Sequence, residues 1–288
     1  MAGEQRGSLT RRLLWRLPVV LAIAAIVFGW IGLNLAGIYF RDALAYWRPD
    51  FADLYGGRHV GVMSTYLYSP AFAQAMWPFG LLPWPLFAAL WSAVNLAALV
   101  WMVGPILAAL LFFIPGSPVV DEISTGNIHI LLGAAIVLGF RWPAAWALPL
   151  LTKITPGIGL LWFAGARQWR ALVVGLGATM AIAIVSYVTF PTGWADWLET
   201  LRRSAEIPVT GDVAVIPGPL WLRVTVAAFI AVAGGALGKR WLAPVAAAIA
   251  LPVPWSSGMS LLVASLALSR ASWQPWLASL PRRLTWKR

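Results

Sequence analysis

Cysteine is absent from this sequence of 288 residues, which excludes disulfide bonds, thiolate metal sites and cysteine nucleophiles. Histidine is nearly absent too, since His59 and His129 alone are too few for a histidine-rich metal site. The motifs GxGxxG, HExxH and GxSxG and the phosphate-binding Walker loop do not occur. The sequence therefore carries no signature of a dinucleotide-binding enzyme, a P-loop NTPase, a zinc protease or an α/β-hydrolase.

Charge is also scarce, and hydrophobic residues dominate. Charged residues make up 11% of the chain, whereas about 25% of a soluble domain is charged. Hydrophobic residues make up 60%, and the mean hydropathy is +0.78. A soluble fold of this size cannot bury so much apolar surface, which argues against both a soluble enzyme and intrinsic disorder. The composition indicates a polytopic membrane protein, and the 19 tryptophans suit two membrane interfaces.

Long hydrophobic runs are few, because proline divides most of them. The first run, at 17–38, follows Arg11, Arg12 and Arg16 and resembles a signal peptide, but its length predicts an uncleaved span. Further apolar stretches follow at 68–82, 84–103, 104–114, 128–140, 143–153, 155–165, 171–190, 219–237, 241–253 and 257–269.

Several of these stretches are too short to cross a membrane core of ~30 Å alone. Proline-broken segments in membrane proteins are tolerated where they line a cavity. We therefore predict an all-α fold in which residues 1–288 form one integral membrane domain. This domain is a transmembrane helical bundle with about ten membrane segments, several of them of half length.

The net charge of +11 is distributed unevenly along the chain. With the N-terminus inside, fourteen cations and one acid fall on the inner side, which includes the tails at 1–12 and 271–288. Seven cations and nine acids fall on the outer side, mainly in loops at 39–67, 115–127 and 191–218. This asymmetry follows the positive-inside rule. We therefore expect both termini in the cytoplasm and the chemistry at the outer face, and the charge needs no nucleic acid to explain it.

Asp42 is the first candidate for chemistry. It follows the first apolar run near the membrane interface, where partial desolvation makes a carboxylate a better base. An ion pair with Arg41 or Arg48, or a helix cap, is the alternative interpretation of Asp42. Further along, Tyr68-Ser69-Pro70 opens an apolar segment, and proline in the first turn with serine as the cap predicts a helix start there.

Asn127 and His129 stand at the beginning of the apolar stretch 128–140. Asn127 is either a helix cap or a functional amide. His129 lies one or two residues inside the membrane, where polar groups are functional by default. A hydrogen-bonded structural histidine is the alternative.

Lys153 lies in the predicted outer turn between two half-length segments. An ammonium group there requires an anionic partner, which is Asp42, Asp121, Glu122 or a substrate phosphate. A metal site made of the carboxylates of Asp121 and Glu122 is an alternative that the sequence leaves open, although we expect no metal.

Three arginines flank the third outer loop: Arg202, Arg203 and Arg223. They are candidates for holding a phosphate. The alternative is solvated pairing with Glu199 and Glu206, which we expect for at least one of them.

The order of these motifs resembles the C-superfamily (GT-C) of integral membrane glycosyltransferases, and most of all the bacterial family 87 mannosyltransferases that use polyprenyl-phosphate mannose. The resemblance covers residues 10–200. Its carrying residues are Asp42 with Tyr46, Tyr68-Ser69-Pro70 in place of Tyr-Pro-Pro, Gly126-Asn127-Ile128-His129 in place of Gly-Gln-x-Asn, and Lys153 with Pro156 in place of a Lys-Pro-like turn.

The resemblance implies that a sugar, with mannose favoured, moves with inversion from a polyprenyl-phosphate donor to a lipid or glycan acceptor. The reaction would occur at the outer face of a bacterial plasma membrane, without a metal or other cofactor. Asp42 would be the catalytic base, and Lys153, one of the three arginines and His129 would hold the donor phosphate. The motifs add three substrate-binding candidates: Asn127, Tyr46 and Tyr68.

Two other functions fit the composition. A transporter or flippase of a lipid-linked sugar would also use half-length segments and a charged site. It would require polar groups accessible from both faces, whereas this sequence places them almost entirely outside, which favours an enzyme. A non-catalytic membrane subunit that stabilises a partner is the third alternative, and it predicts that Asp42 and Lys153 tolerate substitution.

Overall fold

The computed structural model describes residues 40–56, 66–206 and 215–270. Within these ranges every regular element is a helix, which confirms the all-α class. The expected first span at 17–38 and the expected tails at 1–12 and 271–288 lie outside the described residues.

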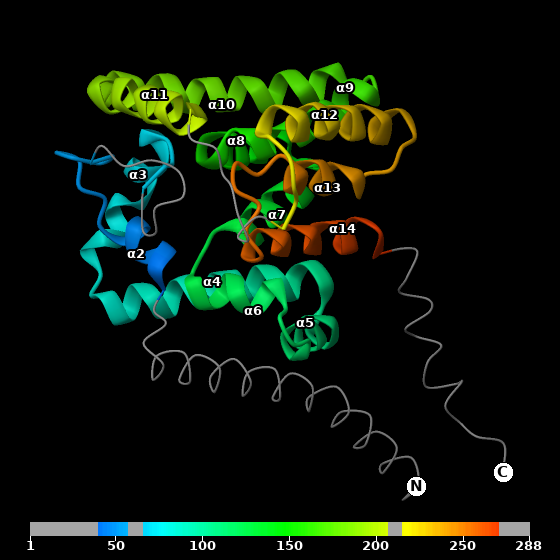
Figure 1. The fold of residues 1–288 in the computed structure, drawn as a ribbon, viewed down its shortest axis with the longest axis horizontal. Coiled ribbons are helices and arrows are strands. Elements are labelled where there is room, and N and C mark those ends of the chain that lie inside the picture. Colours follow the sequence, from blue (N-terminus) through cyan, green and yellow to red (C-terminus); the bar gives the residue numbers. More distant parts are fainter. Residues whose placement is uncertain (1–39, 57–65, 207–214, 271–288) are drawn as a thin grey trace, which may run out of the picture.

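The first half of the described chain forms α2 (Arg41–Trp47), α3 (Pro70–Met76), α4 (Trp84–Val103), α5 (Pro105–Phe113), α6 (Pro118–Thr125) and α7 (His129–Gly139). The second half forms α8 (Ala147–Lys153), α9 (Leu161–Gly165), α10 (Trp169–Thr189), α11 (Pro191–Glu206), α12 (Leu220–Ala236), α13 (Leu242–Ile249) and α14 (Val263–Leu268). Figure 1 shows α9, α10 and α11 along one edge of the molecule and α4, α5 and α6 along the other, with α7, α8 and α13 between them.

Two described helices, α4 and α10, are long and apolar enough to cross a membrane. The pair α5 and α6, bent by 90° at its break, makes a third candidate. The break between α5 and α6 contains Pro115 and Gly116, and Gly116 has a φ of 69°, so these two residues account for the change of direction. The described residues thus contain two or three membrane-capable helices by length and composition, and the expected number of about ten segments stays a prediction.

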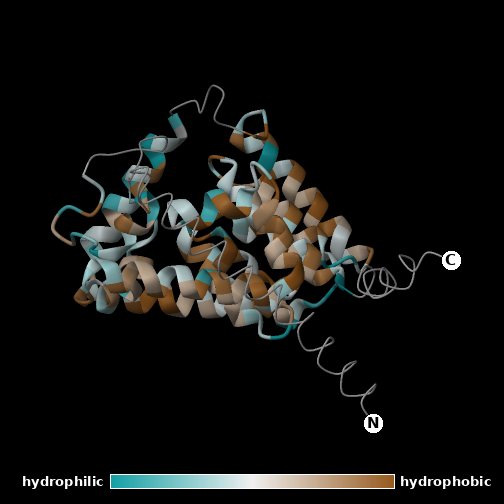
Figure 2. Cartoon of the chain, turned by 90° about the horizontal axis from the view of Figure 1, so that it is seen from below, coloured by the Kyte–Doolittle hydropathy of each residue, from teal (hydrophilic) through white to brown (hydrophobic). Residues whose placement is uncertain are grey.

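Helix α10 exposes apolar side chains along its length. Gly175 and Ser186 are its buried residues, while Val173, Met180 and Val185 are each more than half exposed. Figure 2 shows that the long helices are predominantly hydrophobic. A continuous exposed apolar surface of this kind is unfavourable in water and favourable against lipid. The surface of α10 therefore fits a membrane protein.

Helices occupy parts of the three segments that the sequence assigns to outer loops. These helices are α2, α6 and α11. The difference matters most at α6, where Pro118 lies in the first turn and the hydroxyl of Ser117 accepts a hydrogen bond from the backbone of Val119. This cap stabilises the start of α6 as a helix. The Glu122 side chain on α6 is fully buried.

The chain reverses direction between α8 and α9, as the break between the stretches at 143–153 and 155–165 predicts. Helix α8 ends at Lys153, and Ile154 follows with a φ of 24°. A positive φ is rare for a β-branched residue, so the backbone is strained at this reversal. A 3₁₀ helix then begins at Thr155 with Pro156 in its first turn. The reversal leaves the Lys153 side chain at the end of a short helix.

An aromatic cluster fixes α2 against α3 and α4. Tyr46 is fully buried, and its ring centroid lies 5.0 Å from Tyr68, 5.5 Å from Phe72 and 5.4 Å from Trp91. Each such pair contributes about 0.5–1.5 kcal/mol beyond the burial of its area. Trp91 also donates a hydrogen bond of 2.7 Å to the backbone oxygen of Gly126, which ties α4 to the turn between α6 and α7.

The turn between α6 and α7 packs directly on α2. Gly126 has a φ of 68°, and a Cβ there would lie 2.6 Å from side-chain atoms of both Ala43 and Phe40. Both the backbone conformation and the close approach therefore require glycine. This contact brings Asp42 next to Asn127.

Candidate active site

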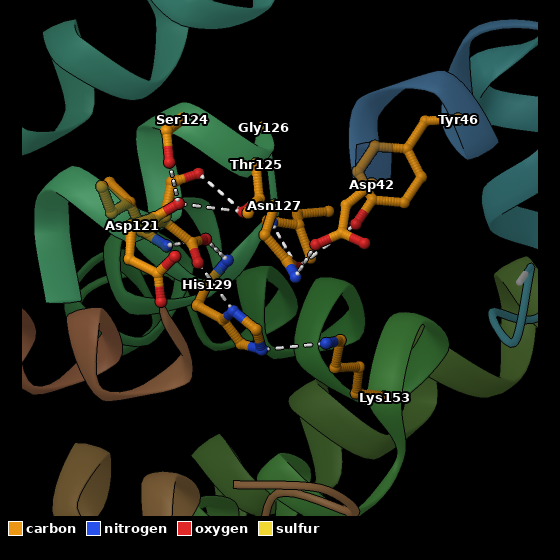
Figure 3. A network of polar contacts seen from close by, with 12 residues as sticks. Asp42, Tyr46, Asp121, Ser124, Thr125, Gly126, Asn127, His129 and Lys153 are labelled. Carbon is orange, nitrogen blue, oxygen red and sulfur yellow. Dashed lines mark hydrogen bonds and ion pairs between the residues drawn. The ribbon is translucent and has the colours of Figure 1, made fainter. Parts of the chain in front are cut away.

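Asp42 and Asn127 form the first part of a polar network that joins four elements (Figure 3). The amide nitrogen of Asn127 donates to Oδ2 of Asp42 at 2.5 Å. The amide oxygen of Asn127 accepts from the backbone of Ile128 at 2.8 Å and from the Tyr46 hydroxyl at 3.2 Å. These two contacts orient the amide so that its nitrogen faces the carboxylate.

The Asp42 carboxyl is partly buried, and this burial raises its pKa above the ordinary value for aspartate. The positive charge of Lys153 opposes the rise, and the hydrogen bond from Asn127 also lowers the pKa. Burial is the larger effect, so the carboxylate is more basic than an exposed aspartate. This is the property that the sequence analysis expects of a base at this position.

Glu122 and His129 form the second part of the network, and both side chains are fully buried. Oε2 of Glu122 lies 2.9 Å from Nδ1 of His129. Oε1 of Glu122 accepts hydrogen bonds from the backbone nitrogens of His129 and Ile130, the latter at 3.3 Å. Glu122 therefore caps the beginning of α7, where a negative charge is favourable, and also holds the imidazole ring.

Lys153 forms the third part, reaching the network from the end of α8. Its Nζ lies 2.8 Å from Nε2 of His129 and 5.6 Å from the ring centroid of Tyr68. An ammonium group only donates, so Nε2 of His129 accepts and Nδ1 carries the proton that is donated to Glu122. A chain of hydrogen bonds thus runs from Glu122 through His129 to Lys153.

The structure therefore brings six of the predicted site residues together. They are Asp42, Tyr46, Tyr68, Asn127, His129 and Lys153. Tyr46 and Tyr68 take part through a hydrogen bond of 2.7 Å between their hydroxyls. The charges of Asp42 and Lys153 act on each other across this network. The carboxylate and the ammonium thus belong to one site.

Arg202 and Arg203 make their described hydrogen bonds elsewhere, on α11. Arg202 contacts Glu199 at 2.9 Å and Glu206 at 2.7 Å, and Arg203 contacts Glu199 at 3.0 Å. The hydrogen bonds from Arg202 and Arg203 lower the pKa of Glu199 to about 2. Both arginines thus form the carboxylate pairs that the sequence analysis gives as the alternative, and a phosphate-binding role for either stays a prediction.

Arg223 is buried, and its guanidinium donates to backbone oxygens. The acceptors are Gly218, Ile249, Leu251 and Pro252, at distances of 2.6 to 3.2 Å. These bonds tie the start of α12 to the end of α13 and satisfy carbonyls that a helix end leaves unpaired. The geometry gives Arg223 a structural role, and its predicted phosphate role stays a prediction.

Glu122 is the member of the network that sequence reasoning did not select as a site residue. The sequence offers Glu122 only as a partner for Lys153 or as part of a carboxylate metal site with Asp121. Its three hydrogen bonds to α7 now account for both of its oxygens. Among the described residues, no group of three metal-ligating side chains occurs. The signal that could have found Glu122 is its spacing: an acid placed just before a new helix suits the helix start.

Comparison with known proteins identifies the family. The family model of glycosyltransferase family 87 matches residues 66–257, which is more than half of the chain. The chain belongs to glycosyltransferase family 87. The family 87 match includes His129, Lys153 and Glu122, and it begins after Asp42 and Tyr46.

A curated relative agrees with family 87 membership. The chain is 24% identical to the polyprenol-phosphate-mannose-dependent alpha-(1-2)-phosphatidylinositol mannoside mannosyltransferase of Mycobacterium tuberculosis. The alignment covers 72% of this chain and 58% of the relative, so the chain spans little more than half the length of that protein. No solved structure matches the chain. Family membership supports a glycosyltransferase activity, and the exposed apolar helices fit a membrane protein.

Proposed function

We propose that this protein transfers mannose from a polyprenyl-phosphate donor to a glycolipid or glycan acceptor, with inversion at the anomeric carbon and within a GT-C fold. The observation that carries the proposal is the meeting of a basic carboxylate, Asp42, with a partly buried ammonium, Lys153, in one polar network. A glycosyl transfer from a phosphate donor needs both groups, one for each substrate.

Asp42 is the base that activates the acceptor. Oδ2 is occupied by the Asn127 amide, and within the described part of the chain Oδ1 has no hydrogen-bond donor. Oδ1 is therefore the oxygen that takes the proton of the acceptor hydroxyl. The hydroxyl oxygen then forms its bond to the anomeric carbon while the bond from that carbon to the donor phosphate oxygen breaks, which inverts the configuration.

Lys153 is the cation for the leaving phosphate. The polyprenyl phosphate gains a negative charge as its bond to the sugar breaks, and a fixed ammonium in a water-poor site stabilises that charge strongly. His129 holds the ammonium at 2.8 Å, and Glu122 holds His129. We assign the phosphate to Lys153 ahead of Arg202, Arg203 and Arg223. The described contacts of those arginines go to carboxylates and carbonyls.

The identities of the donor and the acceptor draw support from the relative. Its name specifies polyprenol-phosphate mannose as the donor and a phosphatidylinositol mannoside as the acceptor. The placement of the reaction at the outer face of a bacterial plasma membrane draws support from the positive-inside rule. A fixed ammonium supplies the charge that a metal ion would otherwise supply, so this mechanism requires no metal.

Reconstitution tests the proposal directly. The full chain in lipid vesicles receives polyprenyl-phosphate mannose labelled in the sugar, together with a phosphatidylinositol mannoside. We expect label to appear in a longer glycolipid, and we expect no label from a nucleotide-linked mannose. Movement of the labelled donor across the vesicle membrane without a new glycosidic product would instead identify a lipid-linked sugar transporter.

A further inference from the structure

A polar cavity of about 350 Å³ lies outside the network just described. One wall is the segment 51–56, which follows α2, and the other wall is α11 with the residue before it. The volume lies at the lower end of the range of about 300–1,000 Å³ that is typical of small-molecule sites. The sequence assigns both walls to outer loops, at 39–67 and 191–218. The cavity therefore opens on the side where acceptor chemistry is expected.

The lining of the cavity suits a sugar. On α11, Asp196, Thr200 and Arg203 lie on one helix face, because they recur at three- and four-residue spacings. Asp53 faces them from the opposite wall. Carboxylates accept hydrogen bonds from hydroxyl groups, and a guanidinium donates them.

An aromatic pair completes the lining. The ring of Phe51 contacts that of Phe190 edge-to-face at 5.6 Å, and both residues line the cavity. Ring faces offer apolar contact to the C–H groups of a sugar, while the polar residues meet its hydroxyls.

The charges of the lining argue against an anion as the occupant. Two carboxylates, Asp53 and Asp196, face one guanidinium, and that guanidinium already contacts Glu199 at 3.0 Å. A phosphate would meet net repulsion here. A neutral, hydroxyl-rich group meets acceptors and donors without this cost.

Each wall of the cavity donates one hydrogen bond to the segment before α3, which carries Tyr68 of the polar network. The Tyr55 hydroxyl donates to the backbone oxygen of Tyr68 at 2.9 Å. The indole of Trp197 donates to the backbone oxygen of Leu67 at 3.1 Å. Tyr68 in turn lies over Lys153 and bonds to Tyr46. The segment 67–68 thus contacts both the cavity walls and the proposed site of transfer.

We propose that this cavity is an acceptor subsite that binds a sugar of the acceptor glycan other than the one carrying the reacting hydroxyl. The assignment rests on the proposed glycosyl transfer and adds where the acceptor is held. An acceptor that reaches both the cavity and Asp42 is an extended glycan. A single sugar occupies one of the two places and binds more weakly.

Two isosteric substitutions test the subsite kinetically. Asp196→Asn and Asp53→Asn remove the charge that receives sugar hydroxyls, and Asn keeps an oxygen for the bond that Asp53 accepts from Gly56. We expect the KM for a phosphatidylinositol mannoside acceptor to rise about tenfold, while kcat and the KM for the donor stay unchanged. Asp50→Asn is the matched control, since Asp50 lies on the same segment beyond the lining and its bond to Ala52 survives the change.

Direct binding separates the subsite from the transfer reaction. Saturation-transfer NMR with a linear manno-oligosaccharide and the purified full chain should show contact signals, stronger than those of methyl mannoside. The signals should weaken in Asp196→Asn and persist in Asp50→Asn. Unchanged signals in Asp196→Asn, or a change confined to the donor KM, would overturn the subsite. Oligosaccharide binding that depends on Asp196 in a protein without transfer activity would uphold the subsite and reject the proposed function.

Discussion

Nζ of Lys153 lies 2.8 Å from Nε2 of His129, so a cation is directed at the one nitrogen of the ring that can accept from it. The direction is set on the other side of the ring, where Glu122 accepts a hydrogen bond from Nδ1. The ammonium is thereby held in place by a neutral group, and its charge remains available to an anionic substrate.

Removing the charge of Lys153 should abolish most of the transfer. We expect Lys153→Met to lower kcat by about 10²–10³, because the leaving phosphate then lacks its cation. Lys153→Arg should retain part of the activity, since arginine keeps the positive charge but replaces the compact ammonium by a planar guanidinium. Kinetics with labelled donor measure both variants. A Lys153→Met protein as active as wild type would remove Lys153 from the mechanism.

Replacing Glu122 by glutamine should reverse the proton arrangement on His129. The amide nitrogen would donate to Nδ1, the ring proton would move to Nε2, and that N–H would face the Lys153 ammonium. We expect kcat to fall by about 10–100-fold, the size seen when orienting groups behind a metal-bound histidine are lost. The thermal midpoint should change little if the amide oxygen still accepts from the start of α7.

Asp121→Asn is the matched control for Glu122→Gln, because it makes the same change one residue earlier on α6. We expect its kcat to stay near that of wild type. Equal losses in the two variants would mean that the negative charge of this helix matters, and that the orientation of His129 does not.

The acidic side of the pH profile should report Asp42. Burial raises the pKa of this carboxyl, and the base must be ionised, so kcat/KM should fall as the pH drops through a value above that of an ordinary aspartate. Asn127→Leu removes a hydrogen bond that favours the ionised form. The pKa of Asp42 should then rise further, and the acidic limb should move to higher pH. A limb that stays in place or moves to lower pH would contradict this assignment.

Arg223 should contribute more to the stability of the fold than to binding of the sugar donor. Arg223→Met leaves the carbonyl oxygens of Ile249, Leu251 and Pro252 without their donor. We expect the free energy of unfolding to fall by about 1–3 kcal/mol, measured by thermal unfolding in detergent, with the donor KM of the folded protein unchanged. An unchanged thermal midpoint with a raised donor KM would favour phosphate binding instead.

The sequence pattern predicts the ends of some helices well, because capping and helix-breaking residues mark those ends. The predicted stretch at 84–103 coincides with α4, since prolines precede it and Gly104-Pro105 ends it. The predicted helix start at Ser69 and Pro70 is confirmed, and the serine hydroxyl accepts from Phe72. Caps and breakers act over a few residues, and a sequence shows them directly.

The partner of Lys153 could not be predicted from the local sequence in the same way. The sequence offers Asp42, Asp121, Glu122 or a substrate phosphate, whereas the structure places His129 next to the ammonium. The sequence pattern places Glu122 in the outer loop at 115–127, whereas the side chain is buried against the start of α7. Both contacts depend on how α6, α7 and α8 pack. Packing of this kind decides between several chemically acceptable partners, and local pattern does not contain it.

The most direct test of the account is mannose transfer by Asp42→Asn. The variant keeps the shape of the side chain and removes the base, so we predict that kcat falls by about 10²–10⁴ while the KM for polyprenyl-phosphate mannose stays close to that of wild type. Transfer at the wild-type rate by Asp42→Asn would contradict the account, because the acceptor hydroxyl would then lose its proton to another group.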